Sequence, residues 1–310
     1  MTRGNPERTG GAASDSVAAP DAAASNALAG AGVAILARRV CPLSIAIARR
    51  FARTGSPVTL MLIETAERRR FSAQERAFQR AHQAFNERRG EAGRGGRLRM
   101  LWTRLPQRWR AMLRRHAARV PLLNRLATDR EARRLGIAVD YVRRHSSAEA
   151  ADCLMRCGIR YVLVGSSNWL LKDPLLSLDS ARILNAHCAK LPEHRGLDAL
   201  PWSVMEGDPT GVSVHLVDTG VDTGPLVLFR EVPPRPGETL LSLRRRVDEA
   251  IPEAYRTAVA GIEGGSLQSV AQAPEAGTHH RPMTLEELEE AERVLATRSP
   301  GQRGPEGAAR

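Results

Sequence analysis

The chain has 310 residues, of which 42% are hydrophobic and 26% charged, and its formal net charge is +12. This length can bury a sizeable core and fits one or two domains. Membrane-spanning segments are not expected, because no apolar run approaches the roughly 20 residues that cross a bilayer. Residues 1–30 lack the continuous apolar stretch of a signal peptide, so we predict a disordered leader on a cytoplasmic protein.

A strand, a helix and a second strand are predicted near the start. Residues 32–39 (GVAILARR) are typical of a short buried strand, residues 43–53 of a helix, and residues 57–64 (PVTLMLIE) of another strand. Residues 66–89 are predicted to be helical and strongly basic. The glycines of residues 90–96 interrupt this segment, and residues 98–126 are predicted to be helical again.

The positive charge of the chain is concentrated in this basic segment. From Glu67 to Arg134 there are 20 arginines and 6 acidic residues, a local balance of +14, which leaves −2 for the rest. One interpretation is a surface for an anionic partner. The other is an Arg-rich helical hairpin whose aromatic side chains pack on the domain or on a second subunit. Phe71, Phe78 and Phe85 are spaced by seven and share one helical face. We therefore favour packing or a homodimer contact, and do not expect nucleic-acid binding.

Strands and helices alternate in the second half of the chain. Strands are predicted at residues 138–142, 161–165, 182–187, 211–217 and 226–232, and helices at residues 147–157, 199–206, 240–262 and 285–295. Thr284 and Glu287 form a capping-box pattern before the last helix. This alternation predicts an α/β fold, with a mostly parallel, Rossmann-like sheet and helices on both faces.

The four cysteines show no metal-binding pattern. Cys153 and Cys157 are four residues apart on a predicted helix, and no second Cys or His pair has a spacing suited to zinc. We expect small buried thiols in a reducing compartment, and no metal site.

Polar side chains end the strand predicted at residues 182–187. Asn185 and His187 are two residues apart, so both side chains point to the same side of the sheet. In open parallel sheets, ligands bind beyond the carboxyl ends of the strands. A loop at residues 191–196 follows and leads into a helix that starts near Leu197. We therefore expect the amide and the imidazole to face one crevice.

A carboxylate is expected to complete this site. Asp222 lies between Gly220 and Gly224, as expected where the backbone folds tightly around a side chain near a ligand. An amide, an imidazole and a carboxylate suit attack by an amine on an activated carbonyl. The amide and a protonated imidazole can stabilise an oxyanion. The carboxylate can raise the pKa of the imidazole and take up the amine proton, directly or through water.

Several short motifs in this part of the chain occur in the order found in one enzyme family. The chain resembles the formyltransferases that use 10-formyltetrahydrofolate, a family that includes methionyl-tRNA, glycinamide ribonucleotide and amino-sugar N-formyltransferases. The similarity is close over residues 161–229 and weaker back to residue 32. It rests on these segments: Asn185-Ala186-His187, Leu191-Pro192, Arg195-Gly196, Trp202, Gly207-Asp208, residues 211–215 (GVSVH) and residues 221–225 (VDTGP).

The resemblance implies roles for the residues at matching positions. Asn185 and His187 would polarise the formyl group and stabilise the tetrahedral intermediate, while Asp222 would hold the imidazole and help to remove the amine proton. His215 matches a family position near the catalytic carboxylate. We count it among the candidate cofactor-binding residues.

Four further residues fall where the family's backbone grips the pterin ring of the folate. They are Ser167, Asn168, Trp169 and Leu170. Simple burial of Trp169 is an equally open interpretation. His194 is expected to be a loop residue, and Asp218 a turn carboxylate.

The chain also departs from the family pattern. The family's usual His-Pro-Ser-Leu-Leu-Pro loop is here His187-Cys188-Ala189-Lys190-Leu191-Pro192, in which Lys190 is expected to be a solvated loop residue. Residues 38–44 (RRVCPLS) lack the glycines of a phosphate cradle, which argues against glycinamide ribonucleotide as the acceptor. The segment after residue 262 shows no run of strands, unlike the C-terminal domain of methionyl-tRNA formyltransferases. Initiator tRNA is therefore not expected.

The predicted organisation has four parts. Residues 1–30 are the leader, residues 31–265 the catalytic domain with a basic insertion at residues 66–134, residues 266–298 a helical extension and residues 299–310 a disordered tail. The leading hypothesis is N-formylation of a small-metabolite amine, such as an amino-sugar nucleotide or a secondary-metabolite amine. Two alternatives remain: a catalytically degenerate binding protein that uses the basic insertion, and a hydrolase of the formyl donor.

Overall fold

The computed structural model describes residues 32–55, 58–66, 72–88, 127–165, 170–273 and 275–297. The strands are β1 (Val33–Arg38), β2 (Leu60–Glu64), β3 (Ala138–Val142), β4 (Tyr161–Val164), β5 (Arg182–His187), β6 (His194–Gly196), β7 (Gly211–Leu216), β8 (Leu226–Glu231) and β9 (Thr278–His280). The helices are α2 (Pro42–Arg53), α3 (Ala73–Arg88), α7 (Thr128–Arg134), α8 (Ala148–Arg156), α9 (Ala199–Glu206), α10 (Leu240–Glu263) and α11 (Leu285–Thr297).

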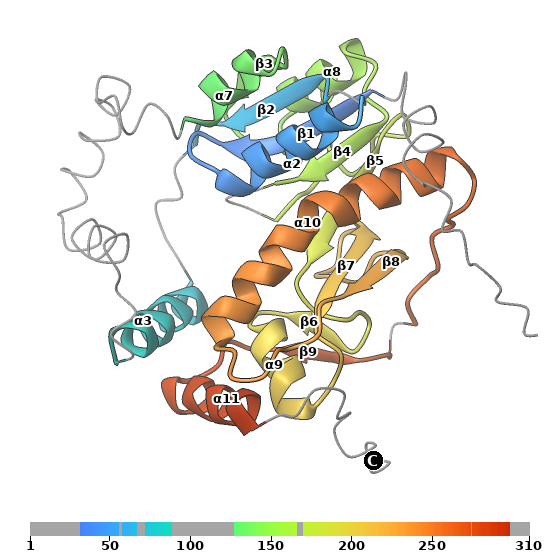
Figure 1. Cartoon of the computed structure of the whole chain (residues 1–310). Helices are drawn as coiled ribbons and strands as arrows, with labels where there is room; N and C mark the ends of the chain where they lie inside the picture. Colours follow the sequence, from blue (N-terminus) through green and yellow to red (C-terminus); the bar gives the residue numbers. More distant parts are fainter. Residues whose placement is uncertain are drawn as a thin grey trace, which may run out of the picture.

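Seven of these strands form one twisted sheet in the order β3-β2-β1-β4-β5-β7-β8 (Figure 1). The first five are parallel, whereas β7 pairs antiparallel with both β5 and β8. The prediction of a mostly parallel sheet is confirmed. Because β7 runs antiparallel to β5, the end of β5 pairs with residues 213–215 of β7.

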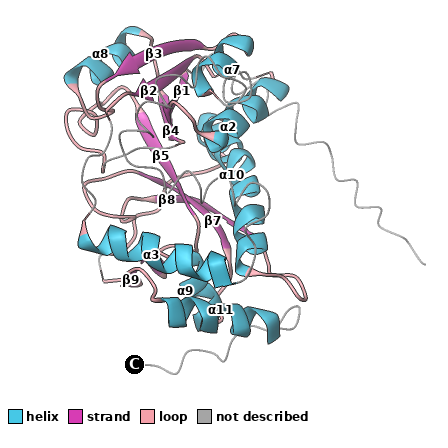
Figure 2. Ribbon diagram, turned by 90° about the vertical axis from the view of Figure 1, so that its left-hand side faces the viewer, coloured by secondary structure: helices cyan, strands magenta, loops and turns pink. Residues whose placement is uncertain are grey.

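The sheet separates two apolar layers, as Figure 2 shows with α8 on one side and α2 and α10 on the other. Successive residues of β1 alternate between these layers: Ile35 packs in the layer that contains α2 and α10, and Leu36 in the layer that contains α8. Because both faces are covered, β1 is an almost continuous apolar run rather than an alternating one.

Helix α10 ties the sheet to α2. The hydroxyl of Tyr255, fully buried on α10, donates to the carbonyl of Val164 on β4 at 2.9 Å. The carboxylate of Glu253 accepts from Arg50 of α2 and, at 2.7 Å, from Arg256 of α10. Burial alone would raise the pKa of Glu253, but the two guanidinium groups outweigh it and lower the pKa to about 2.

Two strands differ from the prediction. Residues 191–196 were expected to be a loop, yet His194–Gly196 form β6, which pairs in parallel with β9. The expectation was wrong because the hydrogen-bonding partner lies more than eighty residues further along the chain, beyond the reach of any local pattern. The side chain of His194, expected on a loop, is completely buried.

The described part of the basic insertion packs on the rest of the molecule. Helix α3 begins after a capping box, in which Ser72 and Glu75 exchange hydrogen bonds. Phe85 is buried in the main core, and Arg88 forms a 2.7 Å ion pair with Glu289 of α11. In Figure 1, α3 lies beside α11 at the lower end of the molecule. These contacts favour the packing interpretation for α3, and the homodimer contact stays a prediction.

Several expectations concern parts of the chain outside the described residues. These are the leader at residues 1–30, the second helical stretch at residues 98–126, the proposed folate contacts Ser167, Asn168 and Trp169, and the tail at residues 299–310. Among the described helices, none is both long and apolar enough to cross a membrane. Cys157 is exposed, so the expectation of burial is wrong for this thiol, which faces solvent just past the end of α8.

Candidate active site

Asn185 and His215 face each other across the antiparallel β5–β7 pair. They are register partners, and Asn185 Nδ2 lies 3.2 Å from His215 Nε2. The other ring nitrogen of His215, Nδ1, lies 2.8 Å from the carbonyl of Leu216. This arrangement assigns the proton to Nδ1, which donates to the carbonyl, while Nε2 accepts from the amide. Among the described residues, only one of the two amide hydrogens of Asn185 is engaged, which leaves the other for a ligand.

His187 ends β5 with its imidazole buried. Its Nε2 donates to the backbone carbonyl of His194 at 2.7 Å, and its Nδ1 lies 3.4 Å from Asp222 Oδ2. Burial lowers the pKa of His187 and outweighs the opposite effect of the Asp222 carboxylate. From the sequence we expected the carboxylate to raise the pKa of this imidazole. The structure instead favours a neutral ring, because little solvent reaches it.

Asp222 lies in the loop between β7 and β8, in a left-handed backbone conformation with a φ of 56°. Its Oδ2 accepts from the backbone N–H of Gly196 at 3.0 Å, and its Oδ1 lies 3.6 Å from His215 Nε2. Gly224 is required here, since a Cβ at that position would meet the carbonyl oxygen of Leu216 at 1.8 Å. The close turn therefore aims the carboxylate back at both histidines.

The charge state of Asp222 follows from these neighbours. Burial by itself would raise its pKa, but the imidazoles of His215 and His187 in their protonated forms, together with the Gly196 N–H, stabilise the anion and lower the pKa to about 2. At neutral pH this carboxylate is ionised and is a weak base. It can orient a neighbouring imidazole and stabilise its protonated form more effectively than it can hold a proton itself.

A segment from the C-terminal extension braces this loop. The side-chain amide of Gln272 donates to the carbonyls of Asp222 and Gly224 at 3.2 and 2.6 Å. Its own oxygen accepts from Arg195 at 3.0 Å. No sequence pattern pointed to Gln272, which lies fifty residues beyond Asp222. The extension thus holds the backbone on either side of the catalytic turn.

Comparison with known proteins gives the family of the chain. A family model described as formyl transferase matches residues 105–259, half of the chain. The chain belongs to the formyl transferase family.

Individual curated relatives match only part of this formyl transferase family member. Methionyl-tRNA formyltransferase of Anaeromyxobacter dehalogenans (strain 2CP-C) is 30% identical over 190 residues, which cover 61% of this chain and 59% of that protein. The methionyl-tRNA formyltransferase of Trichlorobacter lovleyi is 31% identical over 112 residues, 36% of this chain and 35% of that protein. The chain therefore spans between about a third and three fifths of the length of these curated relatives.

A solved structure shows the shared fold. Glycinamide ribonucleotide transformylase 1 from Symbiobacterium toebii superposes with a TM-score of 0.50 at 19% sequence identity, covering 77% of this chain and 94% of that chain. At this identity the likeness concerns the fold alone. The two proteins share this Rossmann-like architecture over nearly the whole length of the compared protein.

The loop that departs from the family's usual pattern is nevertheless well supported. The hydroxyl of Ser213 on β7 accepts from the N–H of Leu191 at 3.0 Å and donates to the carbonyl of Ala189 at 2.7 Å. Lys190 is ion-paired with Glu193. These contacts anchor the loop that follows His187.

Other candidate residues fall outside the central cluster. Leu170 is 65% exposed, and its role at the folate stays a prediction. Asp218 accepts from Gly220 N–H and the Thr223 hydroxyl, as expected of a turn carboxylate.

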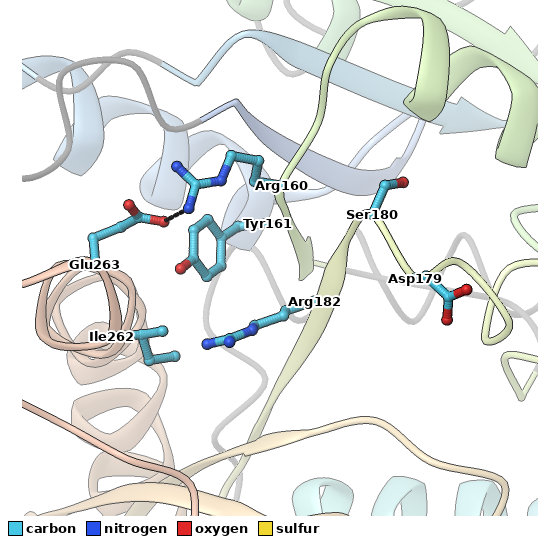
Figure 3. A pocket seen from close by; sticks show the side chains of 7 residues that line it. All are labelled: Arg160, Tyr161, Asp179, Ser180, Arg182, Ile262 and Glu263. Carbon is cyan, nitrogen blue, oxygen red and sulfur yellow. Dashed lines mark ion pairs between the residues drawn. The ribbon is translucent and has the colours of Figure 1, made fainter. Parts of the chain in front are cut away.

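A separate hollow of about 270 Å³ lies at the opposite end of the sheet, where β4 and β5 begin. Figure 3 shows Tyr161 between Arg160 and Arg182, with Glu263 of α10 beside them. Arg160 and Glu263 form a 2.9 Å ion pair. Burial, helped by Glu263, raises the pKa of Tyr161 to about 12. Ligands of such sheets bind at the carboxyl ends of the strands, so the Asn185–His187–Asp222 cluster is the candidate catalytic site.

Proposed function

We propose that this protein transfers a formyl group from 10-formyltetrahydrofolate to an amine of a small metabolite. The observation that carries the proposal is the convergence of three side chains at the end of the sheet. Asn185 and His187 come from β5, and Asp222 comes from the loop between β7 and β8. A free amide hydrogen, a neutral buried imidazole and an ionised carboxylate are the groups that such an acyl transfer needs.

The first step is attack of the neutral amine on the formyl carbon. A carbon–nitrogen bond forms, and the carbonyl electron pair moves to oxygen. The free amide hydrogen of Asn185 stabilises this oxyanion, as a preorganised donor does in other acyl transfers.

The amine proton then passes to Nδ1 of His187, which faces Asp222. The imidazolium is stabilised by the carboxylate on one side and by the carbonyl of His194 on the other. When the carbonyl reforms, the bond to N10 of the folate breaks and the leaving nitrogen takes this proton. The products are the formamide and tetrahydrofolate, and His187 returns to its neutral form.

Asp222 therefore acts through His187. Its pKa of about 2 makes the carboxylate too weak a base to remove the amine proton directly at neutral pH. From the sequence we expected the carboxylate to take up the amine proton, directly or through water, whereas this low pKa favours the imidazole as the acceptor. Asp222 supplies the negative charge that makes proton uptake by this buried ring less unfavourable.

The acceptor is best described as a small amine other than glycinamide ribonucleotide. At the start of α2 the thiol of Cys41 accepts from the N–H of Ser44, while Pro42 has no N–H to offer. Thr128 closes the same turn by accepting from the N–H of Cys41 at 2.8 Å. At these three positions of the turn, the backbone donors that would cradle a phosphate are thus engaged or missing. An amino-sugar nucleotide or a secondary-metabolite amine remains the preferred acceptor.

The test is turnover by the purified full chain with 10-formyltetrahydrofolate and a panel of amino-sugar nucleotides and secondary-metabolite amines. We expect formamide product by mass spectrometry with at least one amine. His187→Ala and Asp222→Ala should each lose it, while Asp218→Asn, a change in the same loop as Asp222, should retain it. Turnover that survives in both alanine variants would refute the proposed centre.

Two other experimental outcomes would support a different function. Folate binding without turnover of any amine, together with salt-sensitive binding to an anionic partner, would favour a degenerate binding protein, the reading suggested by the altered loop. Release of formate without an amine would identify a hydrolase, in which water takes the place of the acceptor.

A further inference from the structure

Three potential metal ligands from distant parts of the chain meet next to the catalytic cluster. His194 lies on β6, His280 on β9, and Glu206 at the end of α9. Nδ1 of His194 lies 2.9 Å from Nε2 of His280, which in turn lies 3.9 Å from Oε1 of Glu206. One ligand atom from each residue fits within 4.8 Å of the others. Both histidines are buried, whereas the carboxylate of Glu206 reaches solvent.

We propose that His194, His280 and Glu206 bind a divalent transition-metal ion, with zinc as the best fit. Two imidazole nitrogens and one carboxylate oxygen form a ligand set that suits this class of metal. Zinc–ligand bonds of about 2.0–2.1 Å place tetrahedral ligand atoms about 3.3 Å apart. The rings therefore need to separate by a few tenths of an ångström, and the Glu206 carboxylate, now 3.9 Å from His280, needs to move closer. The exposed side at Glu206 leaves a coordination position open to solvent.

The surroundings of His194 match those of a metal-binding histidine. Its Nε2 lies 2.8 Å from Oδ2 of Asp208, which fixes the ring and leaves Nδ1 directed at His280. Metal-bound histidines usually donate their second ring N–H to a carboxylate or carbonyl in this way. The ring of Trp202 stacks on His280 at 5.0 Å and holds it in place.

The site would lock the C-terminal extension onto the catalytic loop. Strands β6 and β9 carry one histidine each, so a shared ion clamps their pairing. The carbonyl of His194 accepts the Nε2–H of His187, so the clamp also fixes the catalytic imidazole. A structural ion of this kind stabilises the fold whether or not the protein has formyltransferase activity. The inference is therefore independent of the proposed function.

Zinc binding by the metal-stripped full chain tests the proposal. We expect calorimetric titration with Zn²⁺ to show one ion per chain, and Co²⁺ to give the absorption bands of a low-symmetry nitrogen–oxygen site. Thermal melting should shift upward with Zn²⁺ and return when a chelator is added.

Four variants locate the ion. His280→Ala should abolish stoichiometric binding. Glu206→Gln, at a half-exposed side chain, should weaken it by about tenfold or more, and Asp208→Asn by about 10–100-fold. His279→Ala is the matched control: this exposed histidine is the neighbour of His280 on β9, and its loss should leave the affinity unchanged.

His280→Ala also removes the stack of Trp202 on His280, so its melting temperature in the presence of chelator can fall for that reason alone. In that case the zinc affinity of Glu206→Gln is the deciding measurement, because this variant leaves the stack in place. The absence of one-to-one binding in the wild type would overturn the proposal. Equal affinity in Glu206→Gln and wild type, or equal losses in His279→Ala and His280→Ala, would overturn it as well.

Discussion

The central sheet has two regions that are buried to a similar degree but composed differently. In β1 and β4, residues such as Ile35 and Leu163 are apolar and fully buried. In β5 and β7 apolar residues alternate with polar ones, and His187, Ser213 and His215 are buried beside them. Buried polar groups need partners to offset the loss of water.

Each of these polar side chains has found a partner within the β5–β7 region. His215 bonds Asn185, Ser213 bonds the loop after β5, and His187 bonds the carbonyl of His194. The apolar side chains of the first region thus contribute stability through packing. The second contributes a rigid set of donors and acceptors, some of which remain directed at a ligand. Substitutions in the two regions should consequently change different measurable quantities.

The largest effect is expected for Asn185→Ala. The variant removes the donor that we assign to the oxyanion, and removal of one such donor typically lowers kcat by about 100–1000-fold. The KM for the amine should change little, because the interaction forms mainly in the transition state. Steady-state kinetics would measure both constants. A large rise in KM with an unchanged kcat would contradict the assigned role.

The matching change in the apolar region is Leu163→Ala on β4. Leu163 is fully buried, and truncation of such a leucine lowers the free energy of unfolding by about 2–5 kcal/mol. Its kcat, corrected for the folded fraction, should equal that of the wild type. Urea denaturation followed by kinetics would check both values. If Leu163→Ala lowered kcat as much as Asn185→Ala, the division between the two regions would fail.

Much of this division could be predicted from the sequence. The run of apolar residues in β1 predicts a strand covered on both faces, and the spacing of Asn185 and His187 predicts that they share a side. The glycines around Asp222 predict a tight turn, and Thr284 with Glu287 predicts the start of α11, which the exchanged hydrogen bonds confirm. These signals are local, since each depends on residues within one strand, turn or helix end.

Features that depend on distant pairing could not be predicted in this way. The β6–β9 pair and the contact of Gln272 with the Asp222 loop join segments about fifty to eighty residues apart. Burial of His194 follows from that pairing, so its classification as a loop residue was wrong. The net lowering of the His187 pKa could not be predicted either, because burial opposes the effect of Asp222 and the extent of burial is known only from the fold.

Gln272→Ala tests whether the C-terminal extension supports the catalytic turn. It removes two hydrogen bonds to backbone carbonyls beside Asp222, each worth about 0.5–1.5 kcal/mol. We expect kcat to fall by about tenfold through misplacement of the carboxylate, with a small loss of stability. Gln268→Ala, at an exposed glutamine of the same segment, is the control and should behave as wild type. Equal kcat values for both variants would show that the turn holds its shape unaided.

The smallest effect is expected on the apolar side, at the ion pair between α2 and α10. The pKa of Glu253 is lowered to about 2 in the fold from a usual value of 4.5, so its contribution to stability is complete above pH 4.5. As the pH falls from 4.5 towards 2, the unfolded chain takes up the proton first, and that contribution is lost.

Glu253→Gln should lower the unfolding free energy at pH 7 by about 1 kcal/mol, a magnitude typical of a partly exposed ion pair. It should also flatten the fall in stability over this pH range, as measured by urea denaturation at several pH values. Because Glu253 lies on α10 and contacts Arg50 and Arg256 rather than the polar ends of β5 and β7, kcat at pH 7 should not change. An acid slope identical to that of the wild type would show that other carboxylates, Asp222 among them, carry the pH dependence.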